Sequence, residues 1–223
     1  MLDSHRIVIT GAAGTLGQAA AEKARASGAY VIGLDIVDTD SVPNTDEYYQ
    51  LNLMDRDATK ARFDTFGSID ALFNIAGGFT MGDTAFDPTS EQWDKLFALN
   101  VNTMRNATMA AVPLLTRKPK SAIVNIGAMG ALKGIGTMSA YCCSKGSVMK
   151  LTESLSDELR ESGVNVNAVL PSVIDTAPNR ESMPDADFSK WVSPAQLAEV
   201  ICFLASPAAS GIHGALLPVR GLS

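Results

Sequence analysis

Tyr141 and Lys145 are the residues whose types and spacing most directly indicate chemistry. They lie four positions apart at the start of a helix expected over 141–161, so both side chains share one face. A lysine ammonium beside a phenol stabilises the phenolate and lowers a pKa that is otherwise about 10. Tyr141 could then act as a general acid or base near neutral pH. The alternative interpretation is a tyrosine and a lysine that merely decorate a helix surface.

A glycine-rich run suggests where a cofactor would bind. Residues 10–17 read T-G-A-A-G-T-L-G, between a strand expected over 7–10 and a helix expected over 16–26. Glycine lets the backbone approach a ligand, and the helix N-terminus offers free N–H groups to a pyrophosphate. Such glycines also occur in ordinary tight turns, but the strand before and the helix after fit a dinucleotide fingerprint.

Asp35 ends the second expected strand, 18 residues beyond Gly17. A carboxylate there can hydrogen-bond both ribose hydroxyls of NAD, and it would repel the 2′-phosphate of NADP. We therefore expect NAD(H) as the cofactor, with NADP(H) as the second option. A solvated aspartate at a strand end is the alternative.

The elements that must position these residues alternate in type. Short apolar, often β-branched, runs predict strands over residues 7–10, 30–34, 69–75, 121–126, 164–170 and 214–219. Between them, helices are expected over residues 16–26, 55–66, 90–115, 141–161 and 194–205. Residues 36–49 and the stretch around Gly82 and Pro88 are expected to be loops.

This order predicts an α/β fold: a doubly wound, Rossmann-type parallel sheet of about seven strands, with helices on both faces. Its ligand crevice should lie at the carboxyl ends of the strands. No linker interrupts the pattern, so we expect a single domain over 1–223. Its NAD-binding half would be 1–120, and its catalytic and substrate half 121–223.

Composition excludes several classes of function. The chain is 46% hydrophobic and 19% charged, which is typical of a globular protein, and its net charge of −6 argues against nucleic-acid or anionic membrane partners. No signal-peptide pattern and no membrane-spanning apolar run occurs, so we expect a cytoplasmic location. Three cysteines without C-x-x-C spacing and two histidines predict no metal site.

In order and spacing, these motifs resemble the short-chain dehydrogenase/reductase family over nearly the whole chain. The resemblance rests on the glycine loop, Asp35, N-I-A-G at 74–77, Asn100 in L-N-V-N, and Y-C-C-S-K at 141–145. It implies hydride transfer between nicotinamide and a small-molecule substrate, in a homodimer or homotetramer. Tyr141 would donate the proton and Lys145 would hold the nicotinamide ribose. Asn100 would anchor a water of the proton relay, or serve only as a structural hydrogen-bonding group.

The resemblance also implies a set of cofactor-binding residues. Asn52 and Leu53 would border the adenine, and residues 171–176 would cover the nicotinamide. The whole expected set is Gly11, Gly14, Thr15, Leu16, Gly17, Asp35, Asn52, Leu53, Ala76, Gly77, Gly78, Tyr141, Lys145, Pro171, Val173 and Thr176.

The chain departs from the family at Ala128. The family usually has a serine at this position, 13 residues before the tyrosine, that holds the substrate oxygen. Losing such a preorganised donor can cost about 10²–10³ in rate. Thr137 or Ser139 could replace it.

A narrower resemblance offers a substrate that tolerates this loss. Residues 175–191, the G-x-x-G-x-x-G spacing, A-G-G at 76–78 and the missing serine resemble dihydropteridine reductases. Those enzymes reduce quinonoid dihydropterin with NADH, and that conjugated ring is already primed to accept hydride. Asn100 and the W-D-K-L-F-A-L-N run resemble the broader family instead. Arg180, Met183, Phe188 and Trp191 would either cap the substrate cleft or brace their own loop.

Three hypotheses follow. The leading one is an NADH-dependent reductase of a dihydropterin-like substrate. The second is a carbonyl or 3-oxoacyl reductase in which Thr137 or Ser139 replaces the serine. The third is a catalytically weak nucleotide-binding protein, against which the retained pair Tyr141 and Lys145 argues.

Overall fold

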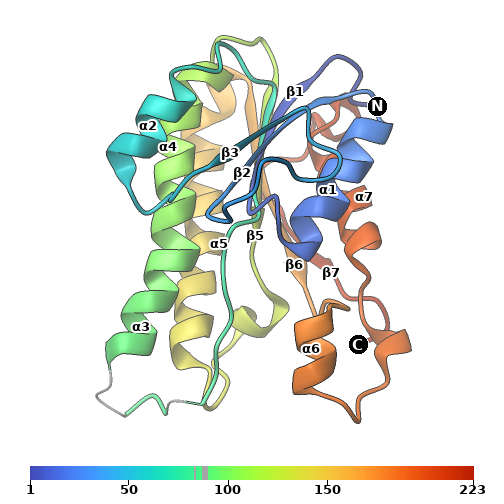
Figure 1. The fold of residues 1–223 in the computed structure, drawn as a ribbon. Coiled ribbons are helices and arrows are strands. Elements are labelled where there is room, and N and C mark those ends of the chain that lie inside the picture. Colours follow the sequence, from blue (N-terminus) through green and yellow to red (C-terminus); the bar gives the residue numbers. More distant parts are fainter. Residues whose placement is uncertain (83, 87–89) are drawn as a thin grey trace.

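The computed structural model describes residues 1–82, 84–86 and 90–223, so Pro88 of the expected loop lies outside it. Its framework is a seven-stranded parallel sheet in the order β3-β2-β1-β4-β5-β6-β7 (Figure 1). The strands are β1 (Arg6–Thr10), β2 (Tyr30–Asp35), β3 (Glu47–Gln50), β4 (Ala71–Asn74), β5 (Ser121–Ile126), β6 (Val164–Pro171) and β7 (Leu216–Val219). The predicted doubly wound fold is confirmed.

Helices cover both faces of this sheet. They are α1 (Thr15–Ala26), α2 (Arg56–Phe63), α3 (Ser90–Phe97), α4 (Thr103–Leu115), α5 (Ser139–Leu159), α6 (Ala177–Ser182) and α7 (Pro194–Leu204). Helices α2, α4 and α5 lie on one face and α1 and α7 on the other, with α6 at one end of the sheet (Figure 1). Within the described residues, none of the helices is both long and apolar enough to span a membrane.

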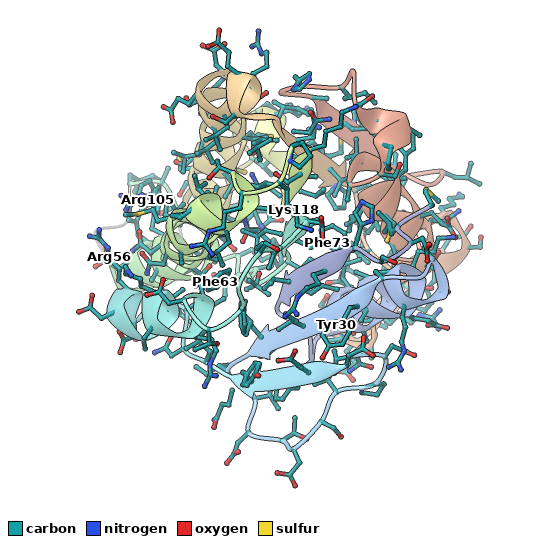
Figure 2. All side chains as sticks on the ribbon, turned by 90° about the horizontal axis from the view of Figure 1, so that it is seen from above. Tyr30, Arg56, Phe63, Phe73, Arg105 and Lys118 are labelled. Atoms are coloured by element: carbon teal, nitrogen blue, oxygen red, sulfur yellow. The ribbon has the colours of Figure 1, made fainter. Side chains whose placement is uncertain are left out.

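Two apolar layers follow from the alternation of side chains along each strand. In β1, Ile7 and Ile9 enter the layer beneath α1 and α7, and Val8 enters the layer beneath α2, α4 and α5. Because both faces are covered, the central strands carry apolar residues at successive positions. Phe73 and Phe63, both fully buried, belong to the first and the second layer respectively (Figure 2).

The expectation of a loop over residues 36–49 is wrong at its end, where β3 pairs with β2. This strand lies at the sheet edge and is only half-buried, so its sequence E-Y-Y-Q has no apolar run. Its two tyrosines make a hydrogen bond and a cation–π contact at the edge of the sheet. The Tyr48 hydroxyl donates to the Val37 carbonyl, and the Arg62 guanidinium lies over the Tyr49 ring. The two tyrosines were the available signal, since aromatic residues favour strands.

The single helix expected over 90–115 is also corrected. It is divided into α3 and α4 by a π-helical turn over Ala98–Asn102. Such turns leave the hydrogen-bonding periodicity unchanged on either side and are frequent at functional sites. Asn100 lies within this turn and is buried.

Candidate active site

The turn between β1 and α1 depends on two glycines. Gly11 has a φ of +70°, and a Cβ there would lie 2.8 Å from the backbone nitrogen of Ala76. A Cβ on Gly17 would lie 2.0 Å from the Gly11 carbonyl oxygen. The turn after β1 can therefore pack against the turn after β4 only because these side chains are absent.

The N-terminus of α1 is open to a ligand. Its cap residue, Gly14, has no side-chain hydrogen bond to the first turn, and that turn contains no acidic residue. The free N–H groups and the positive end of the helix dipole suit an anionic group such as a pyrophosphate.

Asp35 has a structural contact in addition to its expected role. One carboxylate oxygen accepts a hydrogen bond from the Ala13 N–H at 2.9 Å, and the other accepts from Ile36 and Val37 at 2.7 and 3.3 Å. The carboxylate therefore braces the glycine loop while it lines the adjacent cleft.

This cleft, of about 370 Å³, lies at the carboxyl ends of the strands. It brings together much of the expected cofactor set: Gly11, Gly14, Thr15, Leu16, Gly17, Asp35, Asn52, Leu53, Ala76, Gly77 and Thr176. Sequence reasoning missed its other lining residues, Ile36, Leu51, Met54, Ile75, Leu99, Thr103 and Pro178. Most of these residues are next in the sequence to an expected site residue, and that proximity was the only sign in the sequence that they would line the cleft.

The remaining expected cofactor residues do not line the cleft. Pro171 is buried at the end of β6, where it pairs with Val219, and the Val173 carbonyl accepts from the Val192 N–H. These two residues fix the start of the segment that follows β6. Gly78, Tyr141 and Lys145 lie outside the cleft lining, next to Gly77 or in α5.

Asn100 connects the cleft to α5. Its Oδ1 accepts from the Gly78 N–H at 2.8 Å, while its Nδ2 donates to the Gly78 carbonyl at 3.1 Å and to Ser144 Oγ at 3.0 Å. Both amide hydrogens are therefore used by protein atoms. A side-chain role in holding water is limited to the remaining capacity of Oδ1, so the structural role considered from the sequence is present here.

Lys145 is buried, and its Nζ donates to the Ile126 carbonyl at the end of β5, at 2.8 Å. Burial lowers its pKa from 10.5 to about 8. A Cβ on Gly77 would lie 3.3 Å from this Nζ and 2.7 Å from Asn100 Oδ1. Lys145 and Asn100 therefore converge on one backbone position of the cleft.

Tyr141 does not show the lowered pKa expected from its neighbour. Burial raises the pKa of its phenol to about 12, with a smaller contribution from Cys142. Lys145 is not among the causes of this shift, and its ammonium donates to the Ile126 carbonyl. The Phe79 ring packs edge to face with Tyr141, with the ring centroids 4.8 Å apart, and helps to keep water away.

The site has no hydroxyl at residue 128, where the buried Ala128 precedes the short turn Met129–Leu132. The Thr137 hydroxyl, one candidate to replace the family's serine, donates its proton to the neighbouring Gly136 carbonyl. Ser139 is the first residue of α5, and no hydrogen bond of its side chain is formed with the described part of the chain.

Residues 175–191, which precede α7, are held mainly by contacts with one another. Arg180 forms two hydrogen bonds to the Asp175 carboxylate, at 2.6 and 2.8 Å, and its guanidinium lies 4.9 Å from the centre of the Phe188 ring. Phe188 in turn packs against Trp191. Of this segment only Thr176 and Pro178 line the cleft.

A second hollow, of about 320 Å³, lies at the amino ends of the strands, opposite the cleft, and is lined by none of the expected site residues. Asp70 on its wall is paired with Lys118, which Figure 2 labels. Across the described residues, no group of three or more His, Cys, Asp or Glu could hold a metal ion.

Comparison with known proteins gives one family. A model of the short chain dehydrogenase family matches residues 5–187. The chain is 33% identical, over 70% of its length and 67% of the relative, to 2-(S)-hydroxypropyl-CoM dehydrogenase 3 of Xanthobacter autotrophicus. It is 29% identical, over 99% of its length and 98% of the relative, to a 3-oxoacyl-(acyl-carrier-protein) reductase of Thermotoga maritima.

A solved structure from Beutenbergia cavernae, assigned as an NAD(P) dependent gluconate 5-dehydrogenase with bound NADP, has a TM-score of 0.90 and 26% identity. The match covers 99% of this chain and 96% of that one. Fold, motif order and family model agree, and the chain belongs to the short-chain dehydrogenase/reductase family of oxidoreductases.

Proposed function

We propose that this oxidoreductase uses NADH to reduce a conjugated, already activated ring, with quinonoid dihydropterin as the specific test substrate. The observation that carries this proposal is the buried methyl group of Ala128, where the family usually has a hydroxyl donor. A ketone relies on that donor to stabilise its developing oxyanion. A quinonoid ring distributes the incoming charge over its own conjugated system.

The cleft residues fit a nicotinamide dinucleotide. Gly11 and Gly17 leave the loop free of side chains, the open N-terminus of α1 suits the pyrophosphate, and Asp35 suits an unphosphorylated ribose. When bound there, the dinucleotide supplies the hydride. The related structure from Beutenbergia cavernae contains a bound dinucleotide of this class, NADP.

The protonation state of Tyr141 suits the direction of reduction. The phenol is protonated at neutral pH, as a phenol with an ordinary pKa also is, so Tyr141 carries the proton that a reduction requires, although the pKa of about 12 makes it a weaker acid. Lys145 is largely cationic at neutral pH despite its lowered pKa. Its Nζ donates to the Ile126 carbonyl, and the family resemblance implies that it would hold the nicotinamide ribose.

A carbonyl or 3-oxoacyl reductase is the second candidate, because relatives with hydroxyalkyl and 3-oxoacyl substrates in their names match this chain. In that case Ser139 would have to provide the hydroxyl that residue 128 lacks.

The substitution Ala128→Ser separates the two candidates. If the acceptor is a conjugated ring, the wild type reduces quinonoid dihydropterin and turns over simple ketones poorly. The new hydroxyl then raises kcat/KM only for ketones, by up to about 10²–10³. Ala131→Ser, in the same short turn, is the matched control for an added hydroxyl. Rapid ketone reduction by the wild type without pterin activity would establish the carbonyl reductase instead.

A further inference from the structure

Ser144 lies in the sequence between Tyr141 and Lys145, the two residues that carry the proposed chemistry. Its side chain forms a hydrogen bond to neither of their side-chain polar atoms and makes hydrogen bonds of its own. The side chain is completely buried on α5. Its hydroxyl oxygen accepts from Asn100 Nδ2 at 3.0 Å, and its proton is donated to the Tyr141 carbonyl at 2.9 Å. The hydroxyl therefore joins the π-helical turn to the first turns of α5.

This bond completes a continuous path of hydrogen bonds. Asn100 holds both the N–H and the carbonyl of Gly78, at 2.8 and 3.1 Å, and Gly77 beside it lines the cofactor cleft. From Gly78 the path runs through Asn100 to Ser144 and ends on the backbone of Tyr141. Two segments that are far apart in the sequence are thereby held at a fixed spacing.

We propose that Ser144 is a positioning residue that acts through Asn100. Its hydroxyl fixes the second amide hydrogen of Asn100, which in turn sets the backbone at 77–78 relative to Tyr141. Because a positioned proton donor must lie within hydrogen-bond reach of its acceptor, a small change in this spacing lowers the rate of the chemical step. This inference rests on the proposed role of Tyr141 as proton donor.

Removing the hydroxyl has a defined consequence. In Ser144→Ala one buried N–H of Asn100 loses its partner, and the amide is free to rotate away from Gly78. We expect kcat to fall about fivefold to tenfold, in line with the usual effect of one lost buried hydrogen bond. KM for the substrate should change less than kcat, because Ser144 does not itself line the cleft.

Ser147 provides a matched control on the same helix. Its hydroxyl donates to the Cys143 carbonyl at 3.0 Å, a similar bond to the helix backbone, without contacting Asn100. Ser147→Ala should therefore leave kcat unchanged. Ser144→Cys keeps nearly the same volume with weaker hydrogen bonds, so it tests the same idea if Ser144→Ala does not fold.

A double-mutant cycle decides whether Ser144 acts through Asn100. If it does, Asn100→Ala combined with Ser144→Ala reduces kcat no further than Asn100→Ala alone. Additive losses, or equal kcat values for the Ser144 and Ser147 variants, would overturn the proposal. The proposed function has its own test: if Tyr141→Phe keeps its rate, that function fails. If Tyr141→Phe is slow while Ser144→Ala and Ser144→Cys are as fast as wild type, only the positioning role fails.

Discussion

The glycine loop after β1 and the first turns of α5, which form the two ends of the site, are stabilised in different ways. At the glycine loop, the geometry depends on atoms that are absent, since Cβ atoms at Gly11 and Gly17 would overlap neighbouring backbone. At α5 the geometry depends on buried polar atoms that are present, namely those of Asn100, Ser144 and Lys145. Adding atoms should damage the first end, and removing atoms should damage the second.

Substitutions at these two ends should therefore affect different properties: folding stability at the glycine loop and the reaction rate at α5. The loop is held by backbone packing, so changes there alter the fold before they alter the reaction. The α5 end holds desolvated groups whose pKa values are shifted by burial, and burying them costs folding free energy.

The largest effect is expected from removing one oxygen at the α5 end. Tyr141→Phe deletes the proton donor but keeps the ring that packs against Phe79, so kcat should fall by about 10²–10⁴. Steady-state kinetics and NADH titration measure this, and NADH affinity and thermal stability should be nearly unchanged. A variant that keeps more than half of the wild-type kcat, with chemistry rate-limiting, would contradict the role of Tyr141.

Adding one carbon at the loop end should act on stability instead. Gly17→Ala places a Cβ 2.0 Å from a backbone oxygen, so we expect unfolding to become easier by about 1–3 kcal/mol. Gly14→Ala is the matched control, because its Cβ would meet nothing closer than 3.4 Å and its φ is −74°. Equal denaturation midpoints for the two variants would remove the distinction between the two ends of the site.

The carboxylate of Asp35 should set the choice of cofactor. We expect kcat/KM to favour NADH over NADPH by about tenfold or more, which corresponds to ~1.4 kcal/mol. Asp35→Asn keeps an oxygen for the Ala13 N–H but removes the charge, so the preference should narrow while the loop stays folded. Equal use of both cofactors by the wild type would show that Asp35 does not select between them.

The smallest effect concerns the cost of burying Lys145. Its pKa is about 8 in the folded protein and near 10.5 in the unfolded chain, so the unfolded chain binds more protons between these values. The free energy of unfolding should therefore rise with pH, by about 1 kcal/mol between pH 7 and pH 9. The raised pKa of Tyr141 acts oppositely, as its contribution is lost from about pH 10 upward, beyond the measured range.

Lys145→Met should abolish this rise in denaturant titrations across that range. The control is Lys150→Met on the same helix, because the Lys150 side chain is 80% exposed. If wild type and Lys145→Met show the same dependence on pH, the ammonium is not desolvated as described.

The parts of the fold that could be predicted are those determined by local pattern. The apolar run of β1 and the glycines after it identified the first turn, and the edge strand β3 was missed because its sequence has no apolar run. The same division holds in the site. Tyr141 and Lys145 were predicted as site residues from their spacing and the dinucleotide-binding pattern before them, but burial reversed the expected direction of the tyrosine pKa. Burial depends on the whole chain, so a four-residue pattern cannot report it.

Asn100 illustrates the same limit. Its position in L-N-V-N was recognisable, but its partners Gly78 and Ser144 are 22 and 44 residues away. The π-helical turn that carries it was not expected within the single helix predicted over 90–115.

That turn makes the length of the segment as important as its composition. A π-helical turn accommodates one residue more than a regular α-helix requires. Deleting one residue from 98–102 would let α3 and α4 merge into an uninterrupted helix, and the side chains that the wider turn now presents would change direction. The Asn100 amide could then no longer face Gly78 and Ser144 together. Segment exchange between related chains must therefore preserve the residue count across this turn, even where every side chain is allowed to vary.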